Sequence, residues 1–143
     1  MKTKKSKCPL VNVLDIVGDK WSLVIIRDLF LRKKTFTDFM KSPEKIASNI
    51  LSNRLEKMNK LGLLEAVKLP EDQKSKIYYL TEKGVDMFPV IFEMMNWSQR
   101  NLDIEYGTKT LKIFKAAEKA SSSNFIKKYQ SSYIKFRDNL IRV

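Results

Sequence analysis

The chain has 143 residues, 43% of them hydrophobic, which is enough for one domain with a real core, alone or with an appendage. Lys and Arg number 28 against 16 Asp and Glu, and the net charge of +12 attracts polyanions, either a nucleic acid or an anionic membrane. The chain has no His and one Cys, which excludes histidine acid–base chemistry, the usual zinc ligand sets and an intrachain disulfide. With only four Gly and four Pro, a sandwich or barrel is disfavoured.

The N-terminal part predicts two helices after a flexible, lysine-rich start over residues 1–7. From Pro9 the apolar residues recur at helical spacing, and Gly18 ends the pattern. We expect Asp19 to cap a second helix, from residue 20 to about 31. This helix is apolar on nearly every side, which is typical of a central core helix.

The next segment predicts a short helix and a turn. Residues 37–41 form the helix, with Phe36, Phe39 and Met40 turned inward, and Thr35-Phe36 forms a bridge to a later sheet. Residues 42–45 make the turn, and Ile46 is a buried anchor.

A second amphipathic helix is predicted over residues 47–61, ending before Gly62, which is expected in the left-handed conformation. Leu51, Leu55 and Met58 are spaced by four and three residues, so they share the buried face. Short polar side chains occupy the opposite face.

Two β-prone runs follow, residues 63–69 and 76–80, joined by the polar link 70–75. Thr81 is predicted to cap a long helix reaching about Leu102, in which Pro89 causes a kink or an irregular turn. Two more helices follow Gly107, separated by Ser121–Asn124. The aromatic stripe over residues 125–140 in the second favours interface packing.

The order helix, helix, hairpin predicts a mainly α fold with a small β-wing, a winged helix-turn-helix. The segments CPLVNVLDIVGDKW, TFTDF, NILSNRLEKMNKLGLLE and YYLTEKG, followed by the Trp97 region, resemble the HxlR-type transcriptional regulators, which are related to the MarR group. The resemblance covers about residues 8–100. It implies a homodimer on operator DNA that dimerises through the N-terminal helix and the helices after the wing.

The resemblance can be followed residue by residue, with two departures. Ala47 stands where Ser or Thr commonly caps the recognition helix, so the start of that helix is either shifted or capped by Ser48. The tail beyond about Tyr106 is longer than the family core requires. The matching positions are Cys8, Gly18, Lys20, Trp21, Leu51, Arg54, Leu55, Gly62, Leu63, Tyr78, Leu80, Thr81 and Gly84.

Base reading needs side chains that donate and accept hydrogen bonds. Asn pairs with adenine through two hydrogen bonds, worth roughly 1–3 kcal/mol against a wrong base. The predicted base contacts are Ser48, Asn49, Ser52 and Asn53. An ordinary solvated helix face is the alternative, and Glu56 on the same face repels phosphate unless it meets a cytosine amine.

Contacts to the DNA backbone are expected from the cations around this helix and on the wing. Arg54 has a second interpretation, an internal pair with an acid that braces the helix, and the two interpretations stay open. The predicted backbone contacts are Lys20, Lys45, Arg54, Lys57, Lys60, Lys74 and Lys76.

Cys8 is the candidate for regulation. Lys4, Lys5 and Lys7 surround it and a helix starts beside it, so charge and helix dipole favour the thiolate, which reacts with oxidants and electrophiles. Some HxlR-type members resemble this arrangement and use the cysteine as a thiol sensor. A small apolar residue at a dimer contact is the equal alternative.

We therefore expect a homodimeric, sequence-specific regulator of double-stranded DNA, with repression favoured over activation. The predicted organisation is a winged helix-turn-helix domain over residues 8–103 and a helical extension over residues 104–143. We expect no enzyme activity, cofactor, metal or membrane partner. We expect a cytoplasmic location, and the sequence does not tell whether a small molecule acts as effector. The alternative function is a protein-interaction adaptor that reuses the fold.

Overall fold

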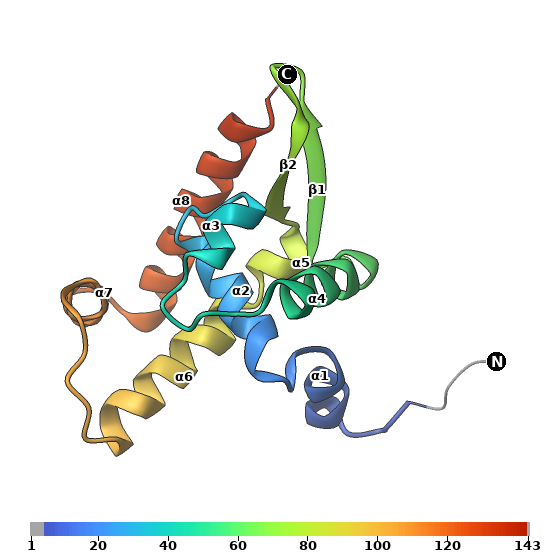
Figure 1. Cartoon of the computed structure of the whole chain (residues 1–143). Helices are drawn as coiled ribbons and strands as arrows, with labels where there is room; N and C mark the ends of the chain where they lie inside the picture. The colour runs from blue at the N-terminus through green and yellow to red at the C-terminus, as the bar shows by residue number, and fades with distance from the viewer. Residues whose placement is uncertain (1–4, 143) are drawn as a thin grey trace. The chain divides into compact units, whose positions relative to one another are not determined.

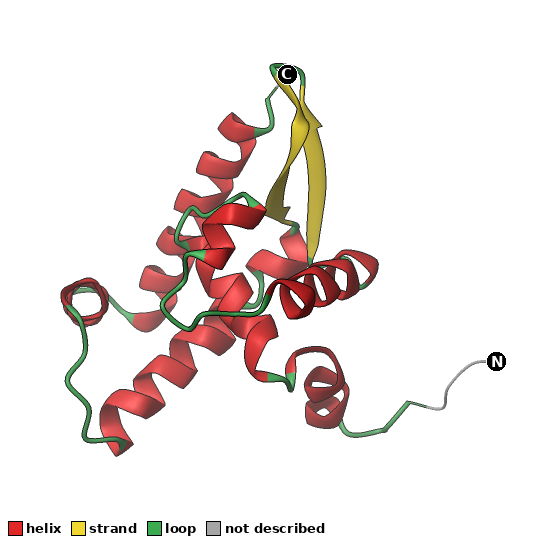
Figure 2. Ribbon diagram, in the orientation of Figure 1, coloured by secondary structure: helices red, strands yellow, loops and turns green. Residues whose placement is uncertain are grey.

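The computed structural model describes residues 5–142 (Figure 1). These residues form helices α1 to α8 and an antiparallel sheet of strands β1 and β2, so the predicted mainly α class with a small wing is confirmed (Figure 2). They fall into two compact units, residues 5–84 and 85–142. This division lies before the predicted boundary at residues 103 and 104, which followed the extent of the family resemblance and stays a prediction. Of the predicted flexible start, residues 1–4 lie outside the described part.

The first two helices begin and end where the sequence indicates. Helix α1 (Pro9–Val17) has proline in its first turn, and α2 (Lys20–Phe30) follows after two residues. One carboxylate oxygen of Asp19 accepts hydrogen bonds from the backbone N–H groups of Trp21 and Ser22, each at 3.0 Å. Asp19 is therefore the predicted N-cap of α2.

Helices α3 (Phe36–Met40) and α4 (Ser48–Lys60) form the helix-turn-helix. Two expectations for α3 are wrong. Met40 is exposed, because a helix this short turns only one face inward and Phe39 occupies that face. The bridge to the wing runs through Lys34, whose carbonyl accepts a 2.7 Å hydrogen bond from the Tyr78 N–H, because Thr35 is already the N-cap of α3.

The wing is the hairpin of β1 (Leu64–Leu69) and β2 (Asp72–Leu80), and it starts after Gly62, whose φ of 77° requires the left-handed conformation. The predicted link over residues 70–75 was too long, since β2 already begins at Asp72. Asp72 lies opposite Leu69, and the register then shifts irregularly before regular pairing resumes with Lys76 opposite Lys68.

The core of the first unit is built around α2. The apolar residues of the helices and wing of this unit that are at most 3% exposed are Ile25, Ile26, Leu29, Phe30, Phe39, Leu51, Leu55, Met58, Leu63, Leu64 and Leu80. Gly84 lies against the backbone at the edge of this core, where a larger residue does not fit, because an added Cβ would lie 2.1 Å from the Leu63 carbonyl oxygen. The core fixes one face of α4 and leaves the other outside.

Beyond the wing lie α5 (Glu82–Val85), α6 (Phe88–Asn101), α7 (Thr108–Glu118) and α8 (Ser122–Leu140). The single long helix expected after Thr81 is interrupted, and Pro89 lies in the first turn of α6, so the irregular-turn alternative is the correct one. The predicted aromatic stripe packs inside the second unit, where Phe88 stacks on Tyr129 at 4.3 Å between ring centroids. Within residues 5–142, no helix has the length and apolar character needed to cross a bilayer.

Candidate nucleic-acid interface

Helix α4 has a buried side and a polar outer side. Leu51 and Met58 are fully buried and Leu55 is 3% exposed, as predicted from their spacing. The four predicted base-contact residues, Ser48, Asn49, Ser52 and Asn53, are all exposed. The prediction about the packing of α4 is thus confirmed, while the role of the outer side chains stays a prediction.

The first turn of α4 lacks a side-chain cap. Ala47 occupies the N-cap position and supplies no side-chain hydrogen bond, so capping by Ser48 is wrong. The helix starts at Ser48, directly after this cap position, so its start is not shifted either. The N–H groups at this end are the orphan donors of any helix start. They are consequently open to an acceptor such as a phosphate oxygen.

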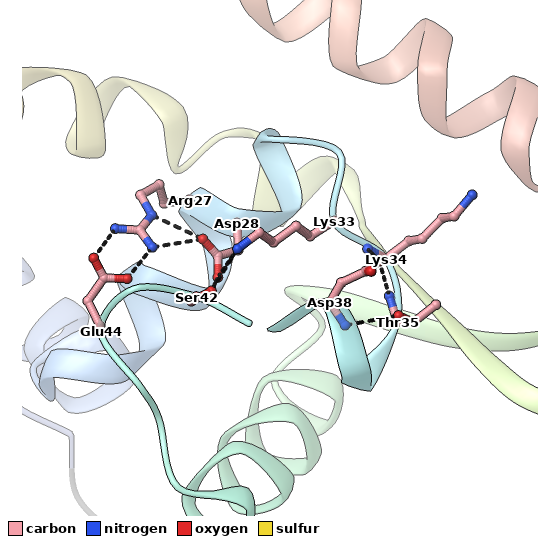
Figure 3. A network of polar contacts seen from close by, with 8 residues as sticks. All are labelled: Arg27, Asp28, Lys33, Lys34, Thr35, Asp38, Ser42 and Glu44. Carbon is pink, nitrogen blue, oxygen red and sulfur yellow. Dashed lines mark hydrogen bonds and ion pairs between the residues drawn. The ribbon is translucent and has the colours of Figure 1, made fainter. Parts of the chain in front are cut away.

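A polar network fixes the turn that leads into α4 (Figure 3). Asp28 of α2 is 2% exposed and accepts two hydrogen bonds from Arg27, at 2.8 and 3.1 Å, and one from the Ser42 hydroxyl. Arg27 also donates two hydrogen bonds to the Glu44 carboxylate, of 2.6 and 3.0 Å. Lys33 donates to Ser42 at 2.8 Å. Because Ser42 and Glu44 belong to the α3–α4 turn, the network ties that turn to the core helix.

The charges in this network stabilise one another. The hydrogen bonds from Arg27 lower the pKa of Glu44 below its ordinary value and outweigh the opposing effect of burial. The same pairing, chiefly with Glu44, raises the pKa of Arg27. Glu44 therefore stays ionised well into mild acid.

A second ion pair holds the middle of α4. Arg54 Nε donates to Asp19 at 2.8 Å, and Arg54 Nη1 donates to the Asn53 side-chain oxygen at 2.7 Å. Burial raises the pKa of Asp19, but the hydrogen bonds from Ser22 and Arg54 together lower it below the ordinary value. Of the two interpretations of Arg54, the structure contains the bracing pair.

The remaining predicted backbone contacts are lysines of α2, of the turn before α4, of α4 itself and of β2. Lys45, in the left-handed conformation at φ 57°, is exposed in the turn. Lys60 pairs with Glu56 at 3.1 Å, and Lys57 donates to the Asp15 carbonyl at 3.2 Å. The other three are exposed, with the Lys20 ammonium 4.7 Å from the Trp21 ring: Lys20, Lys74 and Lys76.

A surface hollow of about 500 Å³ separates α4 from the wing. Ser52, Asn59, Lys60 and Lys76 lie along it, while Leu55 and Tyr78 are among its more buried lining residues. Burial raises the pKa of Tyr78 above its ordinary value. The sequence did not predict this hollow, because it depends on the distance between a helix and a hairpin.

Cys8, the candidate sensor, is exposed at the N-cap position of α1. Its side chain makes no capping hydrogen bond, and its backbone N–H donates to the Ser6 hydroxyl at 3.0 Å. Leu10 and Leu14 follow on α1 and are 64% and 52% exposed. The thiol is thus accessible in one copy of the chain, next to an uncovered apolar face.

Sequence reasoning missed the network around Asp28. The available signal was an aspartate inside a mostly apolar helix, since a buried carboxylate requires partners. It also missed the capping box of α3, in which the Thr35 hydroxyl accepts from the Asp38 N–H while Asp38 accepts from the Thr35 N–H, each at 3.1 Å. The Thr-x-x-Asp spacing is the sequence form of that box.

Residues 16–106 match the family described as HxlR-like helix-turn-helix. An uncharacterized HTH-type transcriptional regulator of Bacillus subtilis, YdeP, is 31% identical over 67% of this chain and 75% of its own length. The crystal structure of PA1607, a putative transcription factor, is 33% identical with a TM-score of 0.66, covering 73% of this chain and 72% of that one.

The reduced form of the regulator YodB from B. subtilis is also similar, with 27% identity, a TM-score of 0.59, and coverage of 68% of this chain and 97% of that one. Diamide-treated YodB matches at 25% identity with a TM-score of 0.54, covering 70% of this chain and 100% of that one. Quinone-bound YodB matches at 25% identity with a TM-score of 0.53, covering 65% of this chain and 98% of that one. These relatives are named as regulators of transcription, and no catalytic family is indicated. The chain belongs to the HxlR-like helix-turn-helix family and is a transcriptional regulator of the helix-turn-helix type.

Proposed function

We propose that this protein binds double-stranded operator DNA sequence-specifically as a homodimer and represses transcription there. The observation that carries the proposal is the outer side of α4, where Ser48, Asn49, Ser52 and Asn53 are exposed opposite the buried row at Leu51, Leu55 and Met58. Hydroxyl and amide groups on a rigid helix are the chemistry that reads base edges in the major groove. The exposed lysines of the turn and the wing add phosphate contacts.

Uncovered apolar surface supports the homodimer. In a single copy Leu10, Val13 and Leu14 of α1 are exposed, as are Met94 and Trp97 of α6, each of the last two by 55%. Clusters of exposed apolar residues on a helix mark association surfaces. A two-fold pair of α4 helices reads a pseudo-palindrome whose half-sites lie roughly 34–36 Å apart.

Selection of bound sites from a random duplex pool, followed by gel shift at about 0.15 M salt, tests the DNA proposal. We expect a pseudo-palindromic site bound by two copies, with affinity that falls steeply as salt rises. Transcription in vitro from a promoter carrying the selected site tests repression. If the protein increases the amount of transcript, it is an activator at this site and not a repressor. Absence of any duplex binding would favour the protein-interaction adaptor instead, because that function leaves α4 free of DNA.

We also propose that Cys8 senses thiol oxidants or electrophiles. Its side chain is exposed at the start of α1, and the similar regulator YodB has been solved in diamide-treated and quinone-bound forms. Alkylation by a maleimide, followed with time and pH, should be fast and should change operator affinity. Cys8→Ser, the matched control, should keep operator binding and lose the response. Slow labelling with unchanged DNA affinity would instead assign Cys8 to dimer packing.

A further inference from the structure

Helix α7 carries a stripe of lysines in the part of the chain beyond the family match, which ends at residue 106. Residues 108–142 hold nine Lys and Arg against two acids, a net charge of +7 out of the +12 of the whole chain. The α7 lysine stripe consists of Lys109, Lys112 and Lys115, with Lys119 at the C-cap, and all four are exposed. At 100° per residue they lie within an arc of about 120° on one side of the helix.

The other side of α7 accounts for its packing. Phe114 is 5% exposed and lies edge-on to Tyr106 at 5.9 Å between ring centroids. Its direction on the helix differs from that of every lysine in the stripe. The lysines consequently contribute nothing to burial, and their charge needs a separate explanation.

The stripe is electrostatically unfavourable for the isolated helix. Lys109, Lys112 and Lys115 repeat at i, i+3, and such like-charge neighbours oppose the helix by about 0.2–0.5 kcal/mol per pair. The helix dipole favours cations near the C-terminus, so it explains Lys115 and Lys119 but acts against Lys109 in the first turn. Among residues 5–142, no ion pair is formed by any lysine of the stripe.

The dimensions of the stripe match a nucleic-acid backbone. The ten residue steps from Lys109 to Lys119 span about 15 Å along the helix. One strand of B-DNA carries about four phosphates in that axial length. A line of four exposed ammonium groups without acidic partners complements such a strand. A site that reads bases requires several short acceptors and donors, and on this side of α7 only Thr108 carries one.

We propose that the α7 lysine stripe binds the phosphate backbone of double-stranded DNA and adds sequence-independent affinity to the sequence-reading contacts of α4. This inference rests on the proposed function, since it presumes that the protein is brought to DNA. Lysine acts here as a mobile point charge, which suits contact with phosphates at many registers. The stripe therefore raises affinity for every duplex by the same factor.

The test compares two triple variants of the full chain that lose the same charge. In the stripe variant Lys109, Lys112 and Lys115 become Gln; in the control variant the exposed α8 lysines Lys127, Lys128 and Lys135 become Gln. Affinity is measured for the selected operator and for a random duplex from about 0.05 to 0.3 M salt. Circular dichroism and thermal unfolding verify that both variants fold like the unaltered protein.

We expect the stripe variant to lose at least tenfold in affinity for both duplexes, with the slope of log affinity against log salt reduced by about 2–3 and the operator-to-random ratio unchanged. The control variant should retain most of its slope. Equal loss in both variants would overturn the proposal, because overall charge would then suffice, and so would an unchanged stripe variant. If the unaltered protein binds no duplex, the proposed function fails first, and that result is distinguishable from failure of the stripe alone.

Anionic vesicles of phosphatidylserine and phosphatidylcholine provide the competing outcome. Sedimentation with these vesicles that depends on the stripe, combined with unchanged DNA binding, would assign the stripe to a membrane and overturn the proposal.

Discussion

Helices α4 and α7 are both amphipathic, and the difference between them lies in the chemistry of their outer sides. On α4 the outer side carries amides and hydroxyls on short side chains, whereas on α7 it carries lysines. Short side chains with fixed hydrogen-bonding atoms discriminate among bases, and long mobile cations respond only to charge. A buried apolar face thus shows that a helix packs, and the exposed face indicates what the helix binds.

The two helices also differ in how firmly their surroundings hold them. Helix α4 is tied by the Arg54–Asp19 pair, and the turn before it is tied by the network of Arg27, Asp28 and Glu44. The stripe lysines of α7 form no such pairs among the described residues. Base reading requires atoms positioned to a fraction of an ångström, while neutralisation of phosphates tolerates movement.

The largest effect on stability is expected from truncating a side chain on the buried side of α4. Leu51→Ala removes a fully buried side chain and should lower the free energy of unfolding by about 2–5 kcal/mol. Denaturant unfolding measures this loss. Ser52→Ala, one residue away on the exposed side, is the control and should change stability by less than about 0.5 kcal/mol. Comparable losses in the two variants would show that α4 does not have one packed and one free side.

Replacement of a base-reading side chain should affect discrimination and leave the fold intact. Asn53→Ala should reduce the preference for operator over random DNA by about 1–3 kcal/mol, while binding to random duplex persists. The Asn53 oxygen already accepts from Arg54, and a second lone pair and two N–H donors remain for a base. Competition gel shifts measure the ratio, with exposed Asn139→Ala as the control. Equal weakening on both duplexes would contradict base reading by Asn53.

Replacing Arg54 tests whether this residue braces α4 through Asp19 or contacts a DNA phosphate. Arg54→Met keeps most of the side-chain length and removes the hydrogen bond to Asp19, so stability should fall by about 1–2 kcal/mol. If Arg54 only braces the helix, the salt slope of DNA binding stays unchanged. A slope reduced by about 0.9 would instead assign a phosphate contact to it. Lys74→Met, on the exposed wing, is the comparison in which the opposite pattern is expected.

The smallest expected effect is a change in stability at acidic pH. The folded-state pKa of Glu44 lies below its ordinary value of 4.5, so its pairing with Arg27 stabilises the fold above that pH. This contribution is lost as pH falls from about 4.5 through the lowered pKa. Glu44→Gln should therefore be slightly less stable than the unaltered protein at pH 7, and the difference should shrink toward pH 3. Thermal unfolding across this range measures it, and a difference that grows in acid would contradict the assignment.

Much of the first unit was predictable because its signals are local. Asp19 before an apolar run, Gly62 after one, and the spacing of Leu51, Leu55 and Met58 each depend on a few neighbouring residues. The predictions that were wrong concern competition between neighbours. Met40 and Phe39 could not both face inward on a helix this short, and β2 begins at Asp72, opposite Leu69, within a segment that the sequence favours as a loop.

The sequence by itself determined the order of the elements, the family and the outer chemistry of α4 and α7, because helical periodicity assigns each residue to a side of its helix. Only the tertiary structure decided how the turn before α4 is held, which acid pairs with Arg54, and that a hollow lies between α4 and the wing. These features join residues that are distant in the sequence, as in the hydrogen bond from Arg54 to Asp19, which lie 35 positions apart. Such partners are selected by the packing of the core, and no local pattern encodes their distance.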